Sequence, residues 1–568
     1  MAKDDSARKE DKGLFDEFTA PTYDEWYKEA VASLKGESFE KKVITKTYED
    51  IDVKPLYLRQ DIENLAAAYS LPGFSPYLRS DEAAGYLERP WRIAQAVAEP
   101  APQRFSQVAA KEVARGQDAL LLSLCPAARR CEDPAGADLA DFDRGLAAFT
   151  AADFAAALSG LDMADLPLFL SCGATALPAL ALVAANVDPK SLAGAVTADP
   201  LAELAREGSL PLPLAAAYNS MAQCTQWAIG NAPGLRTIEV SAAPYHDAGA
   251  SAVQELAYAL ATGTLYLSAM AERGISVDNA APRFVFNFSV GRNMFMEIAK
   301  LRAARALWAQ AVAAMGGNAE AQKMYLCART SFWTKTAYDP YVNLLRNTIE
   351  AFSAVMGGAR AITVTPFDAV VRHPDEFSRR VSRNLQLLLR EEARFTRPVD
   401  PLGGSYALES LTDSVSRRAW AAFQEIQKQG GMETALLTGA PQKACAATAA
   451  KKAAAVAKRK DVFVGVNMYP NAQEPSLADA APDLAAIKKA AVSGVKKAAF
   501  TKELADIGSQ PVSTAIAAAK AGASLAQILG AMQKPGSPVG VEKLSIRRGA
   551  EAFENLRKKA AAHSGTAL

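Results

Sequence analysis

Short apolar segments alternate with longer stretches of helical periodicity through the middle of the chain, from about residue 89 to residue 432. The segments are mostly unalternating and rich in β-preferring residues, as expected for strands buried on both faces. Enough residues separate neighbouring segments to form a crossover helix. The segments cover residues 119–124, 166–172, 192–198, 236–242, 283–289, 324–330 and 360–366, with an eighth candidate at 397–409.

Eight consecutive strand–helix units predict an α/β fold, a closed (β/α)8 TIM barrel over residues 89–432. An open doubly wound sheet is the alternative. Such a sheet would show a glycine-rich phosphate loop after an early strand, and the chain contains neither G-x-G-x-x-G nor a Walker sequence. The pattern therefore favours the barrel.

The region before the barrel, residues 1–88, is predicted to be an N-terminal arm and lead-in segment. Apolar residues recur at helical spacing after Pro21–Thr22, and Gly36 is a suitable stop. This arm carries aromatic residues that need a surface to pack on, either its own barrel or a partner chain: Phe15, Phe18, Tyr23 and Trp26.

The region after the barrel, residues 433–568, is predicted to be a helical appendage that closes over the barrel rather than a separate catalytic domain. Residues 444–460 are alanine-rich and strongly helix-forming, and residues 514–532 continue in the same way. Between them, residues 461–470 are predicted to form a strand that runs into a loop.

Composition and charge mainly exclude classes of partner. The chain has 63 basic and 62 acidic residues, so its charge gives no reason to expect nucleic acid or an anionic membrane as a partner. The first residues lack an apolar signal region and no run of 18 apolar residues occurs, so we expect a cytoplasmic protein.

Cysteine and histidine are both scarce. Six scattered cysteines, of which Cys125 and Cys131 are closest in sequence, indicate ordinary reduced thiols and no zinc site. The three histidines, His246, His373 and His563, limit any mechanism that needs imidazole.

Several segments spread along the chain resemble the methylmalonyl-CoA mutase family of cobalamin-dependent acyl-CoA mutases. They cover residues 23–57, 89–95, 245–263, 293–309, 378–406 and 461–470. The resemblance implies a barrel whose hollow axis admits an acyl-CoA, with a cobalamin domain above it and radical rearrangement of a carbon skeleton. Small residues in the predicted strands would suit such a bore, or would merely finish the strands: Ser123, Ser171, Thr197, Ser241 and Ser289.

The positions that carry catalysis in this family differ here. Alignment on residues 248–250 places Ala243 and Pro244 where the family has tyrosine and histidine, and proline has no donor. A two-residue slip would bring in Tyr245 and His246 but would spoil the match at Asp247.

Further substitutions follow from the same alignment. Ala96 replaces the tyrosine that lies against the substrate, and Glu207 replaces the arginine that pairs with the substrate carboxylate. The resemblance therefore implies no catalytic residues in this chain and no metal ligands. It leaves six possible substrate-binding residues, which are Arg89, Gln95, Tyr245, His246, Arg329 and Glu392.

The family's cobalamin motif, D-x-H-x-x-G, has no counterpart in the contexts YHDAG, RHPDE and AHSGT. Set against the family, the chain is therefore expected to have no cobalamin-binding domain and to bind no cofactor alone, with adenosylcobalamin entering the complex through a partner.

The forms YHDAGAS, GLRTIEV and RRGAEAFENLR resemble the family's small subunit. The predicted function is thus the small, non-catalytic subunit of a heterodimeric methylmalonyl-CoA mutase, whose partner is the large subunit. The alternative is a catalytic barrel that uses a separate cobalamin-binding protein. Acyl-CoA stays a possible ligand in either case, and a barrel that has drifted to another binding role is a third reading.

Overall fold

The computed structural model describes residues 18–471, 474, 477–479, 481–497, 500, 502–505, 507–532 and 539–562. The chain forms two compact units, Met1–Tyr57 and Leu58–Leu568. In the first, α1 (Tyr23–Ser33) begins at a capping box in which Thr22 accepts from the backbone of Glu25 and the Glu25 carboxylate accepts in return. This confirms the helix predicted after Pro21–Thr22. The unit also contains α2 (Phe39–Lys42) and an antiparallel pair, β1 (Thr45–Lys46) and β2 (Asp52–Val53).

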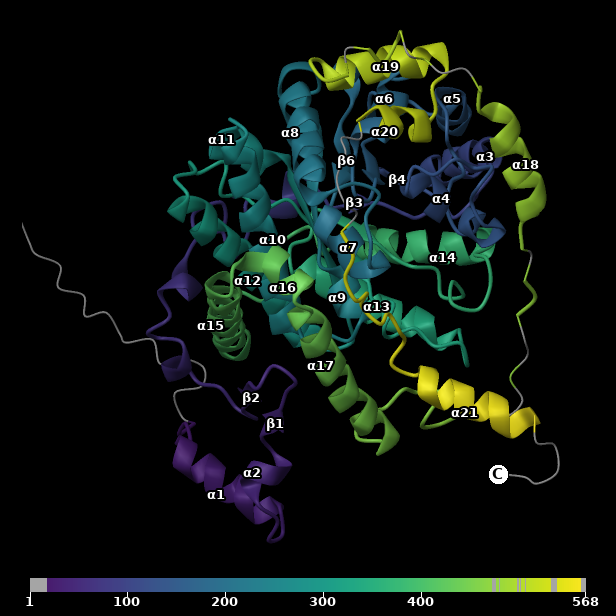
Figure 1. Ribbon diagram of the computed structural model, residues 1–568. Helices are drawn as coiled ribbons and strands as arrows, with labels where there is room; N and C mark the ends of the chain where they lie inside the picture. Colours follow the sequence, from purple (N-terminus) through teal and green to yellow (C-terminus); the bar gives the residue numbers. More distant parts are fainter. Residues whose placement is uncertain are drawn as a thin grey trace, which may run out of the picture. The chain divides into compact units, whose positions relative to one another are not determined.

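The second unit is built on eight parallel strands in the order β3-β10-β9-β8-β7-β6-β5-β4. An isolated parallel bridge between Ala96, just after β3, and Leu121 of β4 closes the ring. Figure 1 shows the strands in the middle of this unit, with helices around them. The strands are β3 (Arg92–Ile93), β4 (Leu120–Ser123), β5 (Leu168–Ser171), β6 (Gly194–Ala198), β7 (Leu235–Ser241), β8 (Phe284–Val290), β9 (Leu326–Thr330) and β10 (Ala361–Thr363). The predicted (β/α)8 barrel is confirmed.

One predicted strand is wrong. Residues 397–409 form turns followed by the start of α15 at Tyr406, and the eighth strand of the barrel is instead β3, directly after the buried Trp91. Pro398 and Pro401 lack backbone donors and Gly403–Gly404 favours a turn, so the segment cannot join a ladder. β3 has only two residues, too few to give a periodic signal.

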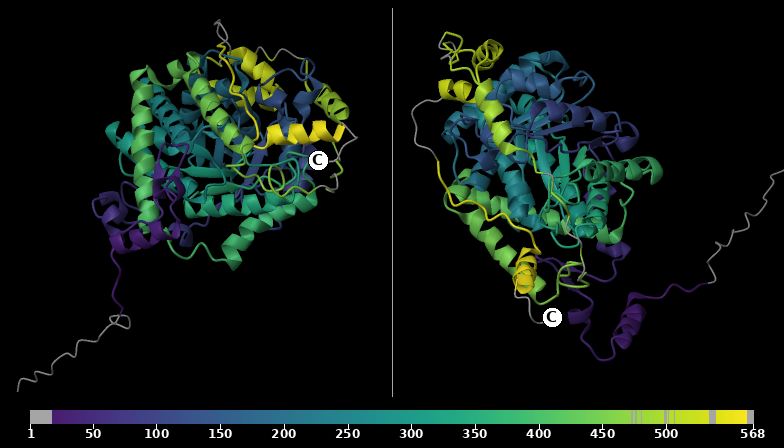
Figure 2. Two further views of the ribbon diagram at one scale, coloured as in Figure 1. Left: turned by 90° about the horizontal axis from the view of Figure 1, so that it is seen from below. Right: turned by 90° about the vertical axis from the view of Figure 1, so that its right-hand side faces the viewer.

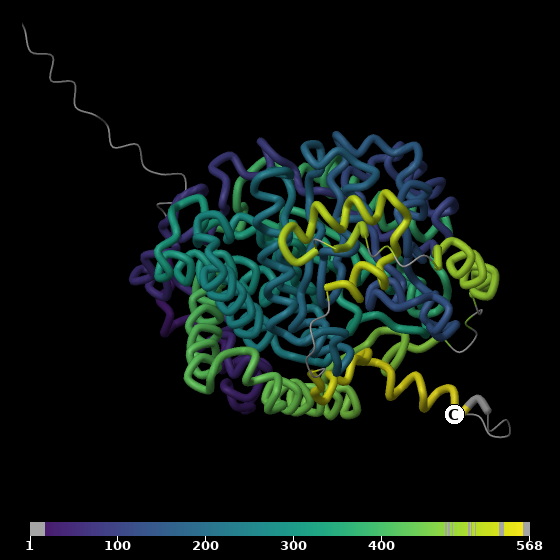
Figure 3. The backbone as a smooth tube through the Cα atoms, turned by 45° about the horizontal axis from the view of Figure 1, so that its top comes forward, coloured from purple at the N-terminus to yellow at the C-terminus, as the bar shows by residue number. Residues whose placement is uncertain are grey.

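Helices surround the strands on the outside of the ring (Figure 3). The long helices α10 and α12 pack against each other and against α15. The helices are α3 (Pro102–Val113), α4 (Pro126–Arg129), α5 (Ala151–Leu158), α6 (Leu177–Ala184), α7 (Pro200–Glu207), α8 (Leu214–Asn231), α9 (Ala243–Asp247), α10 (Ala252–Glu272), α11 (Val277–Ala280), α12 (Met294–Ala314), α13 (Val342–Met356), α14 (Glu376–Leu387) and α15 (Tyr406–Lys428).

The C-terminal part is helical, as predicted for residues 444–460, and it runs over the outside of the barrel (Figure 2). Its helices are α16 (Gly431–Leu437), α17 (Ala440–Ala457), α18 (Leu484–Gly494), α19 (Pro511–Ala521), α20 (Leu525–Met532) and α21 (Glu551–Ala562). α19 and α20 both pack on α6, and they are separated by a turn at Gly522, whose φ is 111°.

The strand predicted within residues 461–470 is also wrong. Only an isolated bridge between Val464 and Met468 occurs there. Gly465 and Tyr469 both have positive φ, and the Asn467 side chain accepts from the backbone of Phe463 at 2.7 Å. These features fold the segment into a tight turn instead of an extended strand.

Candidate ligand site

Inward-facing side chains fill the half of the bore nearest the N-terminal ends of the strands. Phe169, Ala195, Val285 and Cys327 belong to one apolar cluster, with Tyr325 packed against it, and the strand register pairs Phe169 directly with Ala195. The rings of Phe169 and Tyr325 stack with their centroids 6.3 Å apart. These two aromatic side chains lie across the axis that a ligand would have to follow.

Arg236, from β7 midway between these two strands, reinforces this closure. Its guanidinium carbon lies 3.7 Å from the centroid of the Tyr325 ring, a close cation–π contact. Burial lowers the pKa of Arg236, because the low-dielectric surroundings disfavour its charge. Beyond this plug, the cavity in the middle of the bore has a volume of about 50 Å³, room for only a few water molecules.

A larger cavity of about 670 Å³ lies outside the plug, at the N-terminal mouth of the barrel. Most of its charges neutralise one another. Arg360 lies 2.8 Å from both Asp81 and Glu82, and Arg390 lies 2.9 Å from Asp118. Arg89, one of the predicted binding residues, is in this mouth with its side chain 69% exposed.

The other half of the bore, at the C-terminal ends of the strands, is polar. Ser123 and Ser171 are exposed there, and Ser171 and Thr197 line the central cavity. The buried Glu239 carboxylate accepts from Asn287 at 2.6 Å and from Thr197 at 3.0 Å. Small polar residues thus occur in the bore as expected, but they line only one half of it.

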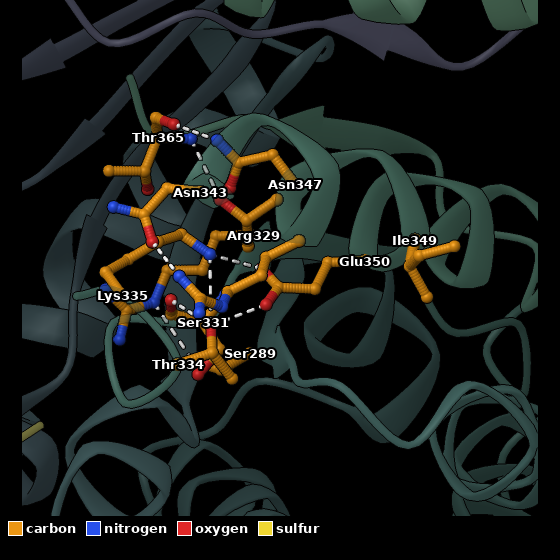
Figure 4. A network of polar contacts seen from close by, with 12 residues as sticks. Ser289, Arg329, Ser331, Thr334, Lys335, Asn343, Asn347, Ile349, Glu350 and Thr365 are labelled. Atoms are coloured by element: carbon orange, nitrogen blue, oxygen red, sulfur yellow. Dashed lines mark hydrogen bonds and ion pairs between the residues drawn. The ribbon is translucent and has the colours of Figure 1, made fainter. Parts of the chain in front are cut away.

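Arg329 projects into this polar half from β9. Its Nε donates to the Ser289 hydroxyl at 3.1 Å, and its Nη2 forms an ion pair with Asp247. Figure 4 shows Arg329 and Ser289 beside the polar network at the end of β9. The side chain is 34% exposed, so it is within reach of a ligand from the C-terminal side only.

His246, in α9, is buried and has both ring nitrogens engaged. Nδ1 is 3.1 Å from the Glu255 carboxylate and Nε2 is 2.7 Å from the Ser331 hydroxyl. Lys300 also contacts Glu255, at 2.6 Å. Although burial opposes ionisation, Lys300 and His246 lower the pKa of Glu255 to about 2. This arrangement is a buried network in which both nitrogens of the imidazole already have partners.

Tyr245 is equally buried. Its ring packs on Tyr258 with centroids 4.9 Å apart, and its hydroxyl has no hydrogen-bond partner among the described residues. Burial raises the pKa of Tyr245 well above its usual value. The phenol is therefore a neutral, packed side chain.

The side chains at the three positions predicted to replace catalytic residues have little capacity for catalysis. Pro244 is buried in the first turn of α9, and Ala96 serves as the bridge partner of Leu121. Glu207 ends α7 and lies 2.8 Å from Arg129. Burial opposes its ionisation, but Arg129 and Arg206 lower the pKa of Glu207, so it stays charged and paired.

The last two predicted residues lie elsewhere. Gln95 is fully buried in the barrel wall, where its Nε2 donates to the Val364 carbonyl at 2.8 Å. Glu392 is exposed at the end of the π-helical turn Leu388–Glu392, beside Arg390 of the N-terminal mouth. The six predicted binding residues therefore do not converge on one site, and their roles in binding stay predictions.

Sequence reasoning missed the residues that shape the bore, Phe169, Tyr325, Arg236 and Glu239. Phe169 and Tyr325 are visible within the predicted strands at 166–172 and 324–330. An alternation count from Ser171 and Arg329 would have assigned both to the inward face. The alternation was therefore visible in the sequence, but only the pairing of the strands shows that the two side chains meet in the bore.

The described histidines do not fit the role of a cobalt ligand. His246 is occupied at both nitrogens, and His373 lies 2.6 Å from Asp143 and 3.2 Å from Asp479. His563 lies outside the described residues. Within the part of the chain that the structure describes, no group of three histidine, cysteine, aspartate or glutamate side chains is arranged to hold a metal.

A second buried network fixes the loop that follows β9 (Figure 4). The Glu350 carboxylate accepts from Lys335 at 2.6 Å and from the backbone of Ser331 at 3.0 Å. Burial lowers the pKa of Lys335 and raises that of Glu350. Asn347 donates to the Thr365 carbonyl at 2.7 Å, so the same helix face is tied to the end of β10.

Among the described helices, none combines the length and the apolar character needed to cross a membrane.

Comparison with known proteins identifies the family. The model described as methylmalonyl-CoA mutase matches residues 46–537. The methylmalonyl-CoA mutase small subunit of Porphyromonas gingivalis is 36% identical over 475 residues, covering 82% of this chain and 72% of that protein. Methylmalonyl-CoA mutase of Escherichia coli is 34% identical over 435 residues, covering 75% of this chain and 61% of that protein.

The large subunit of the Porphyromonas gingivalis enzyme matches as well, at 32% identity over 438 residues, 75% of this chain and 60% of that protein. The chain thus spans between three-fifths and three-quarters of the length of these relatives. With a family match over most of its length and relatives above 30% identity, the chain belongs to the methylmalonyl-CoA mutase family.

Proposed function

We propose that this chain is the small, non-catalytic subunit of a heterodimeric, adenosylcobalamin-dependent methylmalonyl-CoA mutase. The large subunit would bind substrate and cofactor and carry the interconversion of methylmalonyl-CoA and succinyl-CoA. This chain would contribute a second barrel that stabilises the large subunit. Within it, residues 89–432 form the barrel, residues 1–88 an arm and lead-in, and residues 433–568 the appendage.

The observation that carries the proposal is the closed bore. A CoA thioester is long and narrow, so binding along the barrel axis requires a continuous passage. Phe169 and Tyr325 stack across that passage, and Arg236 lies against Tyr325. Opening the passage would break this packing and leave the Arg236 charge without its aromatic contact.

Acyl-CoA chemistry would also need suitably placed hydrogen-bond donors. Stabilising charge on a thioester oxygen requires a hydrogen-bond donor aimed at that oxygen. Pro244 has none, and both ring nitrogens of His246 are already engaged by Glu255 and Ser331. The described histidines also do not fit cobalt ligation, because the ring nitrogens of His246 and His373 already have hydrogen-bonding partners.

The comparisons support the heterodimer. Proteins named small subunit and large subunit occur together in Porphyromonas gingivalis, and also in Streptomyces virginiae, where the small subunit is 34% identical to this chain and the large subunit 33%. The chain is slightly more similar to the small subunit in both cases.

One observation favours the alternative, a catalytic barrel served by a separate cobalamin-binding protein. The C-terminal half of the bore is polar, with Arg329, Glu239 and Asn287 around it and Ser123 and Ser171 exposed. Such a chamber could hold a short polar acyl group that enters from that side, although the CoA moiety could not then pass through the axis.

A reconstitution assay separates the two functions. The purified chain would be tested alone, with the large mutase chain of the same cell, and with a cobalamin-binding protein that lacks a barrel. Each mixture would receive adenosylcobalamin and methylmalonyl-CoA, and both cob(II)alamin and succinyl-CoA would be measured. The proposal expects turnover only with the large chain. Turnover with the barrel-free protein would overturn it.

Arg329→Gln gives a sharper variant, because it changes the polar half of the bore without touching the plug. If the large chain carries the chemistry, the complex with Arg329→Gln should turn over within about twofold of the unaltered complex. A loss of tenfold or more in kcat would place the reaction in this chain. Arg417→Gln, on an exposed pair of α15, is the matched control.

A further inference from the structure

The central cavity, on the C-terminal side of the plug, contains a buried carboxylate. The apolar cluster around Phe169 and Cys327 forms one end of this cavity, whose volume is about 50 Å³. The rest of its lining is polar, and the Glu239 side chain belongs to a residue that is only 4% exposed. The polar lining residues are Ser171, Thr197, Glu239, Asn287 and Thr363. The cavity can therefore hold one small charged group.

Glu239 has only neutral partners. Its two carboxylate oxygens accept from Asn287 and Thr197, and within the described ranges no lysine, arginine or histidine forms an ion pair with it. Two other buried carboxylates of this barrel, Glu255 and Glu350, are each paired with a lysine at 2.6 Å. A charge buried without a counter-charge is costly, so a cation that enters the cavity would regain this energy as affinity.

A second buried carboxylate, Asp199 at the end of β6, strengthens the negative potential. It accepts from the Tyr266 hydroxyl at 2.6 Å and from the backbone of Ser241 at 2.6 Å, and it too forms no ion pair in the described part of the chain. Burial, with the negative charge of Glu239 as a smaller cause, raises the pKa of Asp199 to about 7. This side of the bore therefore attracts positive charge.

A cationic group that can accept a carboxylate lies nearer the C-terminal mouth. Cys327 lines the cavity, and Arg329 is the next residue on the same face of β9, about 7 Å further along the strand. Its Nε and Nη2 are engaged by Ser289 and Asp247, while Nη1 has no partner among the residues that the structure describes. The side chain is 34% exposed, so Nη1 can donate to a ligand carboxylate.

We propose that the C-terminal half of the bore binds a short free amino acid, with its ammonium group on Glu239 and its carboxylate on Arg329. An ammonium group has three donors, and the hydroxyl oxygens of Ser171 and Thr363 line the cavity beside Glu239 to accept the other two. A rise of about 7 Å between the two levels of the bore suits a ligand of about two to four carbon atoms.

This inference goes beyond the proposed function. Methylmalonyl-CoA and succinyl-CoA carry no ammonium group near their acyl carbons, so Glu239 would have no counter-charge in a complex with either. Binding of an amino acid needs no passage through the plug, because the ligand would enter from the C-terminal side. The inference therefore holds whichever subunit carries the mutase reaction.

The test is calorimetric titration of the full chain with glycine, β-alanine and 4-aminobutanoate. Saturable binding at a single site is expected for at least one of them, with a dissociation constant below about 1 mM. Glu239→Gln keeps the size of the side chain and an acceptor for Asn287 but removes the charge, so it should weaken this binding by about tenfold or more. The melting temperature of Glu239→Gln should not fall, because the substitution removes a buried charge that has no counter-charge.

Glu433→Gln is the matched control. Glu433, on α16 outside the bore, also accepts from a neutral hydroxyl, that of Tyr218 at 2.9 Å. This variant should bind the amino acid within about twofold of the unaltered chain. Propionate lacks the ammonium group of β-alanine and propylamine lacks its carboxylate, so each should bind about tenfold more weakly or worse. Arg329→Gln should weaken β-alanine but leave propylamine unchanged.

Four results would contradict the inference. Absence of saturable binding of all three amino acids up to about 10 mM overturns the site. Equal affinity of Glu239→Gln and the unaltered chain removes Glu239 from it. Propionate that binds as tightly as β-alanine makes the chamber a pocket for acyl carboxylates. Potassium binding that is lost in Glu239→Gln and is unaffected by amino acids makes a metal ion the occupant. In each case the proposed function is left standing, because its own test is turnover with the large chain.

Discussion

The two halves of the bore differ although the same strands build them. On β5, Phe169 and Ser171 face inward two residues apart, and the first is buried while the second is exposed. On the strand pair β8 and β9, Tyr325 belongs to the plug, whereas Ser289 and Arg329 form a polar contact at the other end. Passage through this barrel is therefore decided by a few side chains and not by the fold.

That difference also shows that the barrel architecture can be kept whether or not the bore stays open for activity. A (β/α)8 barrel keeps its ring if its inward positions are filled, and filling them adds buried apolar contact. The N-terminal half has the properties of a protein core, and the C-terminal half has those of a solvated cleft. Substitutions in the two halves should accordingly have different consequences.

The largest expected effect comes from Phe169→Ala. Removing a buried aromatic ring from the plug should lower the free energy of unfolding by about 3–5 kcal/mol, measured by urea denaturation. Ser171→Ala, two residues along the same strand, should change it by less than about 0.5 kcal/mol. Similar effects at the two positions would remove the distinction between the halves.

A smaller effect is expected from Arg329→Met in the polar half. The substitution leaves the Asp247 carboxylate, whose side chain is 10% exposed, without its cationic partner. The free energy of unfolding should fall by about 1–3 kcal/mol. Arg417→Met removes an exposed pair on α15 and should cost about 0.3–0.5 kcal/mol. If both variants cost the same, the Arg329–Asp247 pair is no more than a surface contact.

The smallest expected effect is a pH-dependent contribution of His373 to the free energy of unfolding. His373 contacts Asp479 and so links residues 477–479 to the C-terminal side of the barrel. Burial alone would lower the pKa of His373, but Asp143 and Asp479 raise it above its usual 6.5. The folded state therefore holds this proton more tightly than the unfolded state. Its stabilising contribution is complete below pH 6.5 and is lost as the pH rises through the raised pKa.

A series of melting temperatures checks this. The difference between the unaltered chain and His373→Gln should be largest in mild acid and should shrink as the pH rises. A difference that grows with pH would show that the neutral imidazole is the form that the folded state prefers.

Much of the fold could be predicted from the sequence. Seven strands stand out because parallel strands buried on both faces give continuous apolar segments. β3 could not be found, because two residues carry no periodicity. The segment 397–409 looked like a strand, because its apolar residues outweighed its prolines and glycines. The turn at 461–470 looked extended because the positive φ values of Gly465 and Tyr469 leave no mark on hydrophobicity.

The candidate site was less predictable, for a physical reason. The partners of His246 are Glu255 and Ser331, and the second is 85 positions away in the chain. Only the packing of α9, α10 and the end of β9 brings them together. The orientation of Tyr325 across the axis likewise depends on strand register and on Arg236, neither of which a single sequence displays.

The most direct measurement is the affinity of the isolated chain for methylmalonyl-CoA, by isothermal titration calorimetry. Because Phe169 and Tyr325 close the axis, we expect no saturable binding up to about 1 mM, equivalent to a binding free energy weaker than about 4 kcal/mol. Saturable micromolar binding that Phe169→Trp abolishes would contradict it, since the ligand would then pass where the structure places the plug.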